Sequence, residues 1–94
     1  MLSVCTGALI LAAAGILNGK RATTHFAARG ELKEFPGVTL DRLRYVRDGK
    51  IVTSTGVSAG IDMAFYVTRE LFGASVAEDV ARDIEYFPMS EANP

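Results

Sequence analysis

The sequence predicts an α/β domain in which short strands alternate with helices. Two observations support this fold class. The expected order of elements is strand, helix, strand, helix, hairpin, helix, helix, which is that of a layered α/β domain. The composition, 49% hydrophobic and 22% charged residues, is that of an ordinary globular protein. A chain of 94 residues has room for one domain at most.

The first half of the chain is expected to alternate two strands with two helices. The run before the only cysteine is apolar, and the residues after it are small and helix-prone. Gly15 stops the first helix, Asn18-Gly19 marks a turn, and Pro36-Gly37 breaks the second helix. The expected bounds are 2–4 and 21–24 for the two strands, and 6–14 and about 26–34 for the two helices.

The second half is expected to hold a hairpin followed by two helices. Asp48-Gly49 joins β-prone runs at about 42–47 and 50–55, a strong hairpin signal. A small-residue turn, Gly56 to Gly60, then leads into a helix that Gly73 ends. One face of this helix carries residues at three- and four-residue spacing: Ile61, Ala64, Phe65, Thr68, Leu71 and Phe72. The last helix is predicted to end at Pro88. Its apolar face, which is expected to be buried, consists of Val76, Val80, Ile84 and Phe87.

The predicted sheet is incomplete. A parallel sheet needs several neighbouring strands and cover on both faces. This sequence supplies three or four strands, and residues 2–4 look like the last residues of a buried strand whose beginning is missing. We therefore expect residues 1–94 to be a partial domain with a loose tail at 89–94.

Charge and composition narrow the classes of partner. The net charge of -1 argues against direct binding to nucleic acid. A single cysteine cannot form an internal disulfide, so a cytoplasmic location is the default. The apolar run at 9–17 has no basic residue before it and is too short to cross a bilayer, so neither a signal peptide nor a membrane partner is expected. No metal or other cofactor is expected, because one Cys and one His twenty residues apart make a poor zinc pattern.

Cys5 is the residue of greatest chemical interest. It lies where the first strand turns into the first helix, and the unpaired N–H groups at a helix start favour a thiolate. This is the layout of a nucleophile elbow with cysteine in place of serine. The backbone N–H groups of Thr6 and Gly7 are candidates for an anion or oxyanion site. The alternative for Cys5 is a small, buried, inert side chain.

His25, the only histidine, is the candidate partner of Cys5. An imidazole near the thiol can orient the thiolate or transfer protons. The alternative is a histidine at a helix start that is hydrogen-bonded to backbone. Thr6 has a similar alternative, because its hydroxyl can bond backbone groups at the start of the first helix.

Four segments resemble the ThiJ/PfpI superfamily, which has a class I glutamine amidotransferase-like, flavodoxin-like fold. Residues 3–8, SVCTGA, resemble its cysteine elbow, and residues 21–25, RATTH, resemble its histidine motif. Residues 48–54, DGKIVTS, resemble its late hairpin, and residues 56–62, GVSAGID, resemble the glycine-rich turn that follows. The likeness implies the C-terminal half of a three-layer sandwich with a mostly parallel sheet, its N-terminal strands missing.

Within the superfamily, the elbow and histidine motifs look most like isonitrile hydratases. That resemblance implies a hydro-lyase acting on a small molecule, with Cys5 as nucleophile, His25 beside it and Thr6 bordering the substrate. The complete domain is expected to form a homodimer. The same motifs resemble the sensor domain of AraC-type transcription regulators, which would continue into a DNA-binding region. A glyoxalase-like or deglycase-like activity on small aldehydes is a further alternative.

The sequence also departs from the family. Family members are about twice as long, and their N-terminal half supplies the first strands and an acidic residue that contacts the cysteine. The resemblance puts Asp62 on a helix and not beside the thiol. We therefore expect a fragment or truncated protein that has no activity on its own. The alternative is that a separate chain completes the domain.

Overall fold

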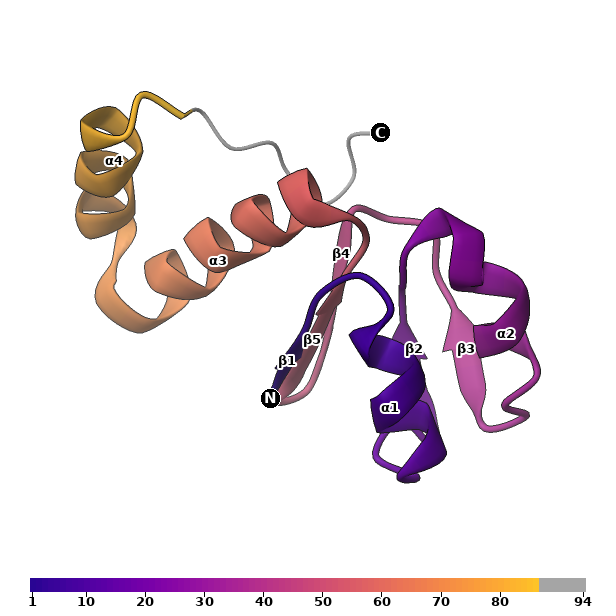
Figure 1. Cartoon of the computed structure of the whole chain (residues 1–94). Coiled ribbons are helices and arrows are strands. Elements are labelled where there is room, and N and C mark those ends of the chain that lie inside the picture. The colour runs from indigo at the N-terminus through magenta and orange to yellow at the C-terminus, as the bar shows by residue number, and fades with distance from the viewer. Residues whose placement is uncertain (87–94) are drawn as a thin grey trace.

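Residues 1–86, which the computed structural model describes, form helices and strands in the order of an α/β domain (Figure 1). The α/β fold class predicted from the sequence is confirmed. A short 3₁₀ helix, η1, precedes α2. The elements are β1 (Leu2–Ser3), α1 (Gly7–Ala13), β2 (Lys20–Ala22), η1 (Phe26–Ala28), α2 (Arg29–Lys33), β3 (Val38–Leu40), β4 (Tyr45–Asp48), β5 (Ile51–Ser54), α3 (Val57–Phe72) and α4 (Ala74–Asp83).

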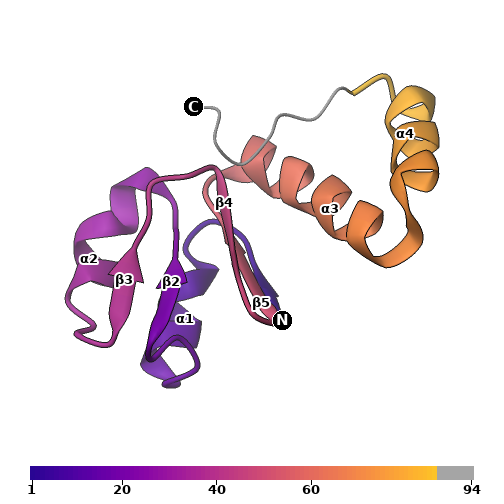
Figure 2. The ribbon, with the colours of Figure 1, turned by 180° about the vertical axis from the view of Figure 1, so that it is seen from behind.

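The strands form two small sheets. In the three-stranded sheet the order is β1-β5-β4, with β1 parallel to β5 and β4 antiparallel to β5. Strands β2 and β3 pair in parallel, with Lys20 opposite Val38. In both views, α3 and α4 lie on one side of the three-stranded sheet, and α1, α2, β2 and β3 lie on the other (Figure 1 and Figure 2).

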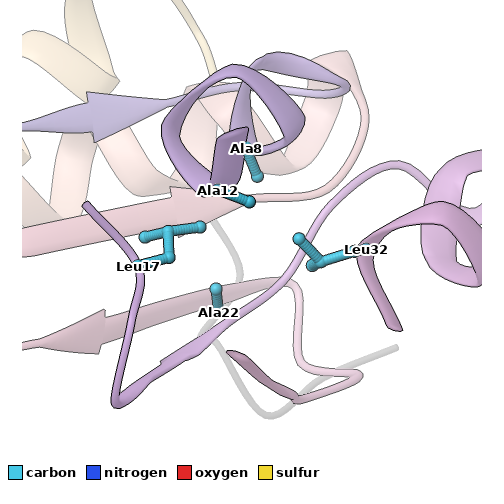
Figure 3. Packing of buried hydrophobic residues seen from close by; sticks show 5 residues of the cluster. All are labelled: Ala8, Ala12, Leu17, Ala22 and Leu32. Carbon is cyan, nitrogen blue, oxygen red and sulfur yellow. The ribbon is translucent and has the colours of Figure 1, made fainter. Parts of the chain in front are cut away.

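Each side of the three-stranded sheet has its own apolar cluster. On one side, small residues let α1 and α2 pack closely on β2 (Figure 3). The members of this first cluster are Ala8, Ala12, Leu17, Ala22 and Leu32. On the other side, α3 packs on the β4–β5 hairpin through Met63, Tyr45 and Val52.

Gly60 brings the first turns of α3 against the chain near β1. A Cβ built on Gly60 would lie 2.9 Å from Cγ1 of Val4, closer than side-chain atoms normally approach. A side chain at position 60 would therefore force Val4 to shift, whereas glycine allows the close approach. The glycine-rich segment thus serves close packing next to the cysteine.

The hairpin and the second helix differ in detail from the prediction. Asp48 and Ile51 form the last strand pair, so the two turn residues are Gly49 and Lys50 and not Asp48-Gly49. Gly49 has φ +64°, which suits a tight hairpin turn. The predicted helix at about 26–34 is split into η1 and α2.

Strand β3 was missed by the sequence analysis. It is three residues long and pairs in parallel with β2, so neither an apolar run nor a hairpin signal marked it. The segment Gly56 to Gly60 was predicted as a turn, yet α3 already begins at Val57.

The predicted buried faces need correction. Leu2 and Val4 are exposed, so only Ser3 of the first strand is buried. On the periodic face of α3, Phe65 is buried, whereas Ile61, Leu71 and Phe72 are exposed. In α4, the described residues of the face that was predicted to be buried are exposed. They are Val76, Val80 and Ile84. Ala77 and Ala81 are buried instead, against Phe65. Phe87, Pro88 and the tail at 89–94 lie outside the described residues.

Among residues 1–86, no helix is both long enough and apolar enough to cross a bilayer.

Candidate functional site

Cys5 lies in the turn between β1 and α1, as the sequence predicted. Its backbone has φ +58°, in the left-handed region that residues with a side chain rarely adopt. Such a conformation costs about 1–3 kcal/mol and persists only where surrounding contacts hold it. The side chain is partly exposed, so the thiol is neither deeply buried nor fully in solvent. These are the features of a sharp, strained turn from a strand into a helix.

Three hydrogen bonds hold the Cys5 backbone from two sides. Its N–H donates to the Thr55 carbonyl at the end of β5, with an N···O distance of 2.9 Å. Its carbonyl accepts from Thr24 Oγ1 at 2.7 Å and from the His25 N–H at 3.3 Å. The elbow is therefore tied to the segment that follows β5 and to the segment that follows β2.

Thr6 and Gly7 differ in what they can offer a ligand. Thr6 precedes the first residue of α1, and its side chain makes no capping hydrogen bond. The Gly7 N–H donates to the Val4 carbonyl at 3.0 Å, so it is already used. Of these two amides, the Thr6 N–H is the one without a hydrogen bond in the described part of the chain.

His25 comes close to the elbow through its backbone and is fixed by local contacts. Its Nδ1 accepts a hydrogen bond from the Ala27 N–H at 3.1 Å. The ring lies against Phe26, with centroids 4.4 Å apart. A Cβ on Gly56 would lie 3.5 Å from His25 Cδ2, so the imidazole also borders the start of α3. Within residues 1–86 the Cys5 thiol makes no hydrogen bond to the imidazole or to any other group.

A group of buried hydroxyl side chains surrounds the elbow, which the sequence analysis did not identify. Its members are Ser3, Thr23, Thr24, Thr53 and Ser54. Ser54 Oγ donates to the Ser3 carbonyl at 3.1 Å, and Thr53 Oγ1 accepts from the Thr23 N–H at 2.9 Å. The signal in the sequence was the runs of Ser and Thr in β-prone segments. Such residues are seldom fully buried unless their hydroxyl groups are hydrogen-bonded.

Asp62 belongs to a separate buried network. The residue is 1% exposed, and its carboxylate accepts from Arg44 Nε at 3.0 Å and from the Arg44 terminal nitrogen Nη2. Tyr86 Oη donates to the other carboxylate oxygen at 2.7 Å. This hydrogen bond raises the pKa of Tyr86, and burial of its hydroxyl adds to the shift. The Arg44 side chain is largely buried in its ion pair with this carboxylate.

A hollow of about 330 Å³ lies away from the elbow. Its lining comes from β1, the β4–β5 hairpin and the second half of α3: Met1, Leu2, Arg47, Gly49, Lys50, Val52, Tyr66, Val67, Glu70 and Leu71. None of the predicted site residues lines it. In the described part of the chain, no three His, Cys, Asp or Glu side chains group as metal ligands would.

Comparison with known proteins gives a consistent result. Residues 1–70 match the DJ-1/PfpI family. The chain is 46% identical over 86 residues to the isonitrile hydratase of Pseudomonas putida. It is 32% identical over 90 residues to the HTH-type transcriptional regulator CdhR of Pseudomonas aeruginosa. The crystal structure of a THiJ/PfpI family protein from Pseudomonas syringae superposes with a TM-score of 0.86 at 40% identity over 98% of the chain.

These matches cover most of this chain and a minority of each relative. The alignment with the isonitrile hydratase includes 92% of the present chain and 37% of the hydratase. The alignment with the regulator includes 95% of the present chain and 26% of the regulator. The Pseudomonas syringae structure is covered over 38% of its length.

Proposed function

The chain belongs to the DJ-1/PfpI family, and from that premise we propose that it forms part of an isonitrile hydratase-like hydro-lyase with Cys5 as the nucleophile. The observation that carries this proposal is the backbone of Cys5, held at φ +58° in a turn between a strand and a helix. A cysteine with only a packing role has no need of a strained conformation. The 46% identity to the Pseudomonas putida isonitrile hydratase supports the choice of reaction.

The proposed reaction adds water to an isonitrile, R–N≡C. The Cys5 thiolate attacks the terminal carbon, a C–S bond forms, and that carbon takes up a proton to give the thioimidate R–N=CH–S–Cys5. Water then adds to the same carbon. The C–S bond breaks, the thiolate leaves, and proton transfer to nitrogen gives the N-substituted formamide R–NH–CHO. One water is consumed, and the enzyme is regenerated without any redox change.

His25 is the group we assign to proton transfer. Because Nδ1 accepts the Ala27 N–H, the neutral imidazole carries its proton on Nε2. A fixed tautomer leaves Nε2–H available as a donor toward a substrate or the thiolate. Thr6, which makes no capping hydrogen bond, is the residue we assign to the border of the substrate site.

The proposal has three further parts. Another stretch of polypeptide completes the domain, and the completed domain forms a homodimer. The protein is cytoplasmic and binds a small-molecule substrate. Exposed apolar residues on α3 and α4 support the proposal that a further stretch covers them. These residues are Ile61, Leu71, Phe72, Val76, Val80 and Ile84. Apolar side chains in such number on two adjacent helices are typical of surfaces that other chain segments cover. Strand β1 also occupies an outer position in its sheet, so one of its edges is unpaired within the described residues. The acidic group that would face the thiol is assigned to the missing stretch.

A chimera tests the function. Residues 1–94 replace the aligned part of the Pseudomonas putida isonitrile hydratase, and the chimera is incubated with a simple alkyl isonitrile while the formyl proton of the product is followed by NMR. We expect formamide to form, and to be lost in Cys5→Ala and Cys5→Ser variants. Thr23→Val, a substitution at a buried hydroxyl near the elbow that makes no hydrogen bond of its own, is the matched control and should leave turnover unchanged. Turnover that survives Cys5→Ala would exclude the nucleophile role.

The likeness to the CdhR regulator favours one alternative function, a ligand-sensing part of an AraC-type transcription regulator. The genomic sequence on both sides of this chain separates the two. A helix-turn-helix region in frame downstream would support the regulator, whereas an upstream half-domain alone would support the hydro-lyase.

A further inference from the structure

The Cys5 backbone needs an external restraint, since its left-handed conformation is unfavourable for a residue with a side chain. The N–H of Cys5 is held by a backbone carbonyl, that of Thr55, which any residue at position 55 would supply. The carbonyl of Cys5 is held differently. Its shorter hydrogen bond, 2.7 Å, comes from a side chain, the hydroxyl of Thr24.

We infer that Thr24 is a positioning residue that holds the nucleophile elbow in its strained conformation through the Cys5 carbonyl. Thr24 is fully buried, so no water competes for its hydroxyl. The adjacent His25 N–H reaches the same carbonyl at 3.3 Å, a longer and weaker contact. The segment that carries the proposed proton-transfer residue thus also fixes the peptide of the proposed nucleophile. This inference rests on the proposed role of Cys5 and extends it to the group that holds Cys5 in place.

Thr23 offers a matched control next in sequence. Thr23 and Thr24 are both fully buried, and both follow β2. The Thr23 hydroxyl, however, makes no hydrogen bond within the described residues, and its backbone N–H is what bonds Thr53 Oγ1. Replacement by valine keeps the shape of a threonine side chain and puts a methyl group in place of the hydroxyl. Thr23→Val and Thr24→Val therefore differ mainly in the hydrogen bond to the Cys5 carbonyl.

The test measures the alkylation rate of Cys5, the only thiol in the chain, by iodoacetamide. Rates are taken for the full 94-residue chain in buffer and in concentrated urea, with circular dichroism as the check on folding. Loss of a hydrogen bond worth about 0.5–1.5 kcal/mol should lower the rate in buffer by about twofold to tenfold. We expect this loss in Thr24→Val, with a wild-type rate in Thr24→Ser and in Thr23→Val. A Thr24→Val variant that is folded and reacts at the wild-type rate would overturn the inference.

If Thr24→Val fails to fold, the same substitution in a Cys5→Gly background tells whether Thr24 holds the left-handed backbone or has a general packing role. Glycine adopts the left-handed conformation without strain, so Thr24→Val should fold there if Thr24 acts by holding that conformation. Failure to fold in the glycine background would show a general packing role and overturn the inference. A wild-type rate in buffer no higher than in urea would contradict the proposed nucleophile instead, which separates the two failures.

Discussion

The exposed apolar residues at the end of α3 lead to a quantitative prediction about self-association. Leu71 and Phe72 are 69% and 68% exposed in this structure. Full burial of a Leu or Phe side chain is worth about 1.5–3 kcal/mol, so covering both exposed portions would contribute about 2–4 kcal/mol. An isolated chain without a covering segment should recover part of this free energy by binding other copies of itself.

We therefore expect the purified chain to associate with itself, and Leu71→Lys/Phe72→Lys to weaken that association. If half of the burial free energy is realised, the dissociation constant should rise about tenfold, since each 1.4 kcal/mol is a factor of ten. Lysine near the C-terminal end of a helix is favourable for the helix dipole, so the helix itself should persist.

Sedimentation velocity over a series of concentrations measures this association. Ile10→Lys is the matched control, because Ile10 is 73% exposed but lies on α1, on the other side of the three-stranded sheet. Its substitution should leave the dissociation constant unchanged. A wild-type chain that stays monomeric and melts in one sharp transition would refute the reasoning, as would an equal effect of Ile10→Lys.

Three further predictions concern the chimera defined above, measured by urea unfolding. Asp62→Asn should cost about 3 kcal/mol, because it leaves the largely buried Arg44 without its charge partner, whereas Asp79→Asn in the exposed pair with Arg82 should cost at most about 0.5 kcal/mol. Folding raises the pKa of Tyr86, so this group stabilises the folded state. That contribution to the free energy of unfolding is complete below the ordinary tyrosine pKa and is lost as pH rises through the pKa of the folded state. Stability should therefore fall more steeply above pH about 10 in the wild type than in Tyr86→Phe. Cys5→Gly should be about 0.5–1 kcal/mol more stable than Cys5→Ala. Glycine removes strain of about 1–2 kcal/mol at φ +58° but loses about 0.5–1 kcal/mol through the greater freedom of the unfolded chain.

The sequence predicted what depends on local chemistry. The strand–turn–helix context of Cys5 and the hairpin between β4 and β5 followed from residue types that act over a few positions. Strand β3 was missed because its three residues pair in parallel with β2, a contact that no local pattern announces. The hairpin turn was placed one residue early, since Asp48 closes the ladder as the partner of Ile51.

The errors in burial have a different cause. The periodicity of Val76, Val80 and Ile84 predicts a face suited to burial, yet in the described residues α4 packs only through Ala77 and Ala81 against Phe65. Amphipathic spacing indicates which face of a helix is suited to burial. It does not indicate whether another element packs against that face.

The contacts around the candidate site depend on tertiary packing. The bond from Thr24 to the Cys5 carbonyl joins residues nineteen positions apart, and the pairing of Arg44 with Asp62 joins a strand end to a helix. The left-handed backbone of Cys5 also could not be read from the sequence, because glycine is the residue that ordinarily marks that conformation.

The central claim is that Cys5 supports turnover, as the nucleophile of the reaction, only when the domain is completed. The most direct test adds the N-terminal part of the Pseudomonas putida isonitrile hydratase, as a separate chain, to the purified 94-residue chain and follows formamide production from an alkyl isonitrile. The account predicts no turnover by either chain alone, turnover by the mixture, and none by a mixture that carries Cys5→Ser. Turnover by the 94-residue chain alone that Cys5→Ser abolishes would contradict the need for a second stretch, and turnover by the mixture that survives Cys5→Ser would contradict the nucleophile.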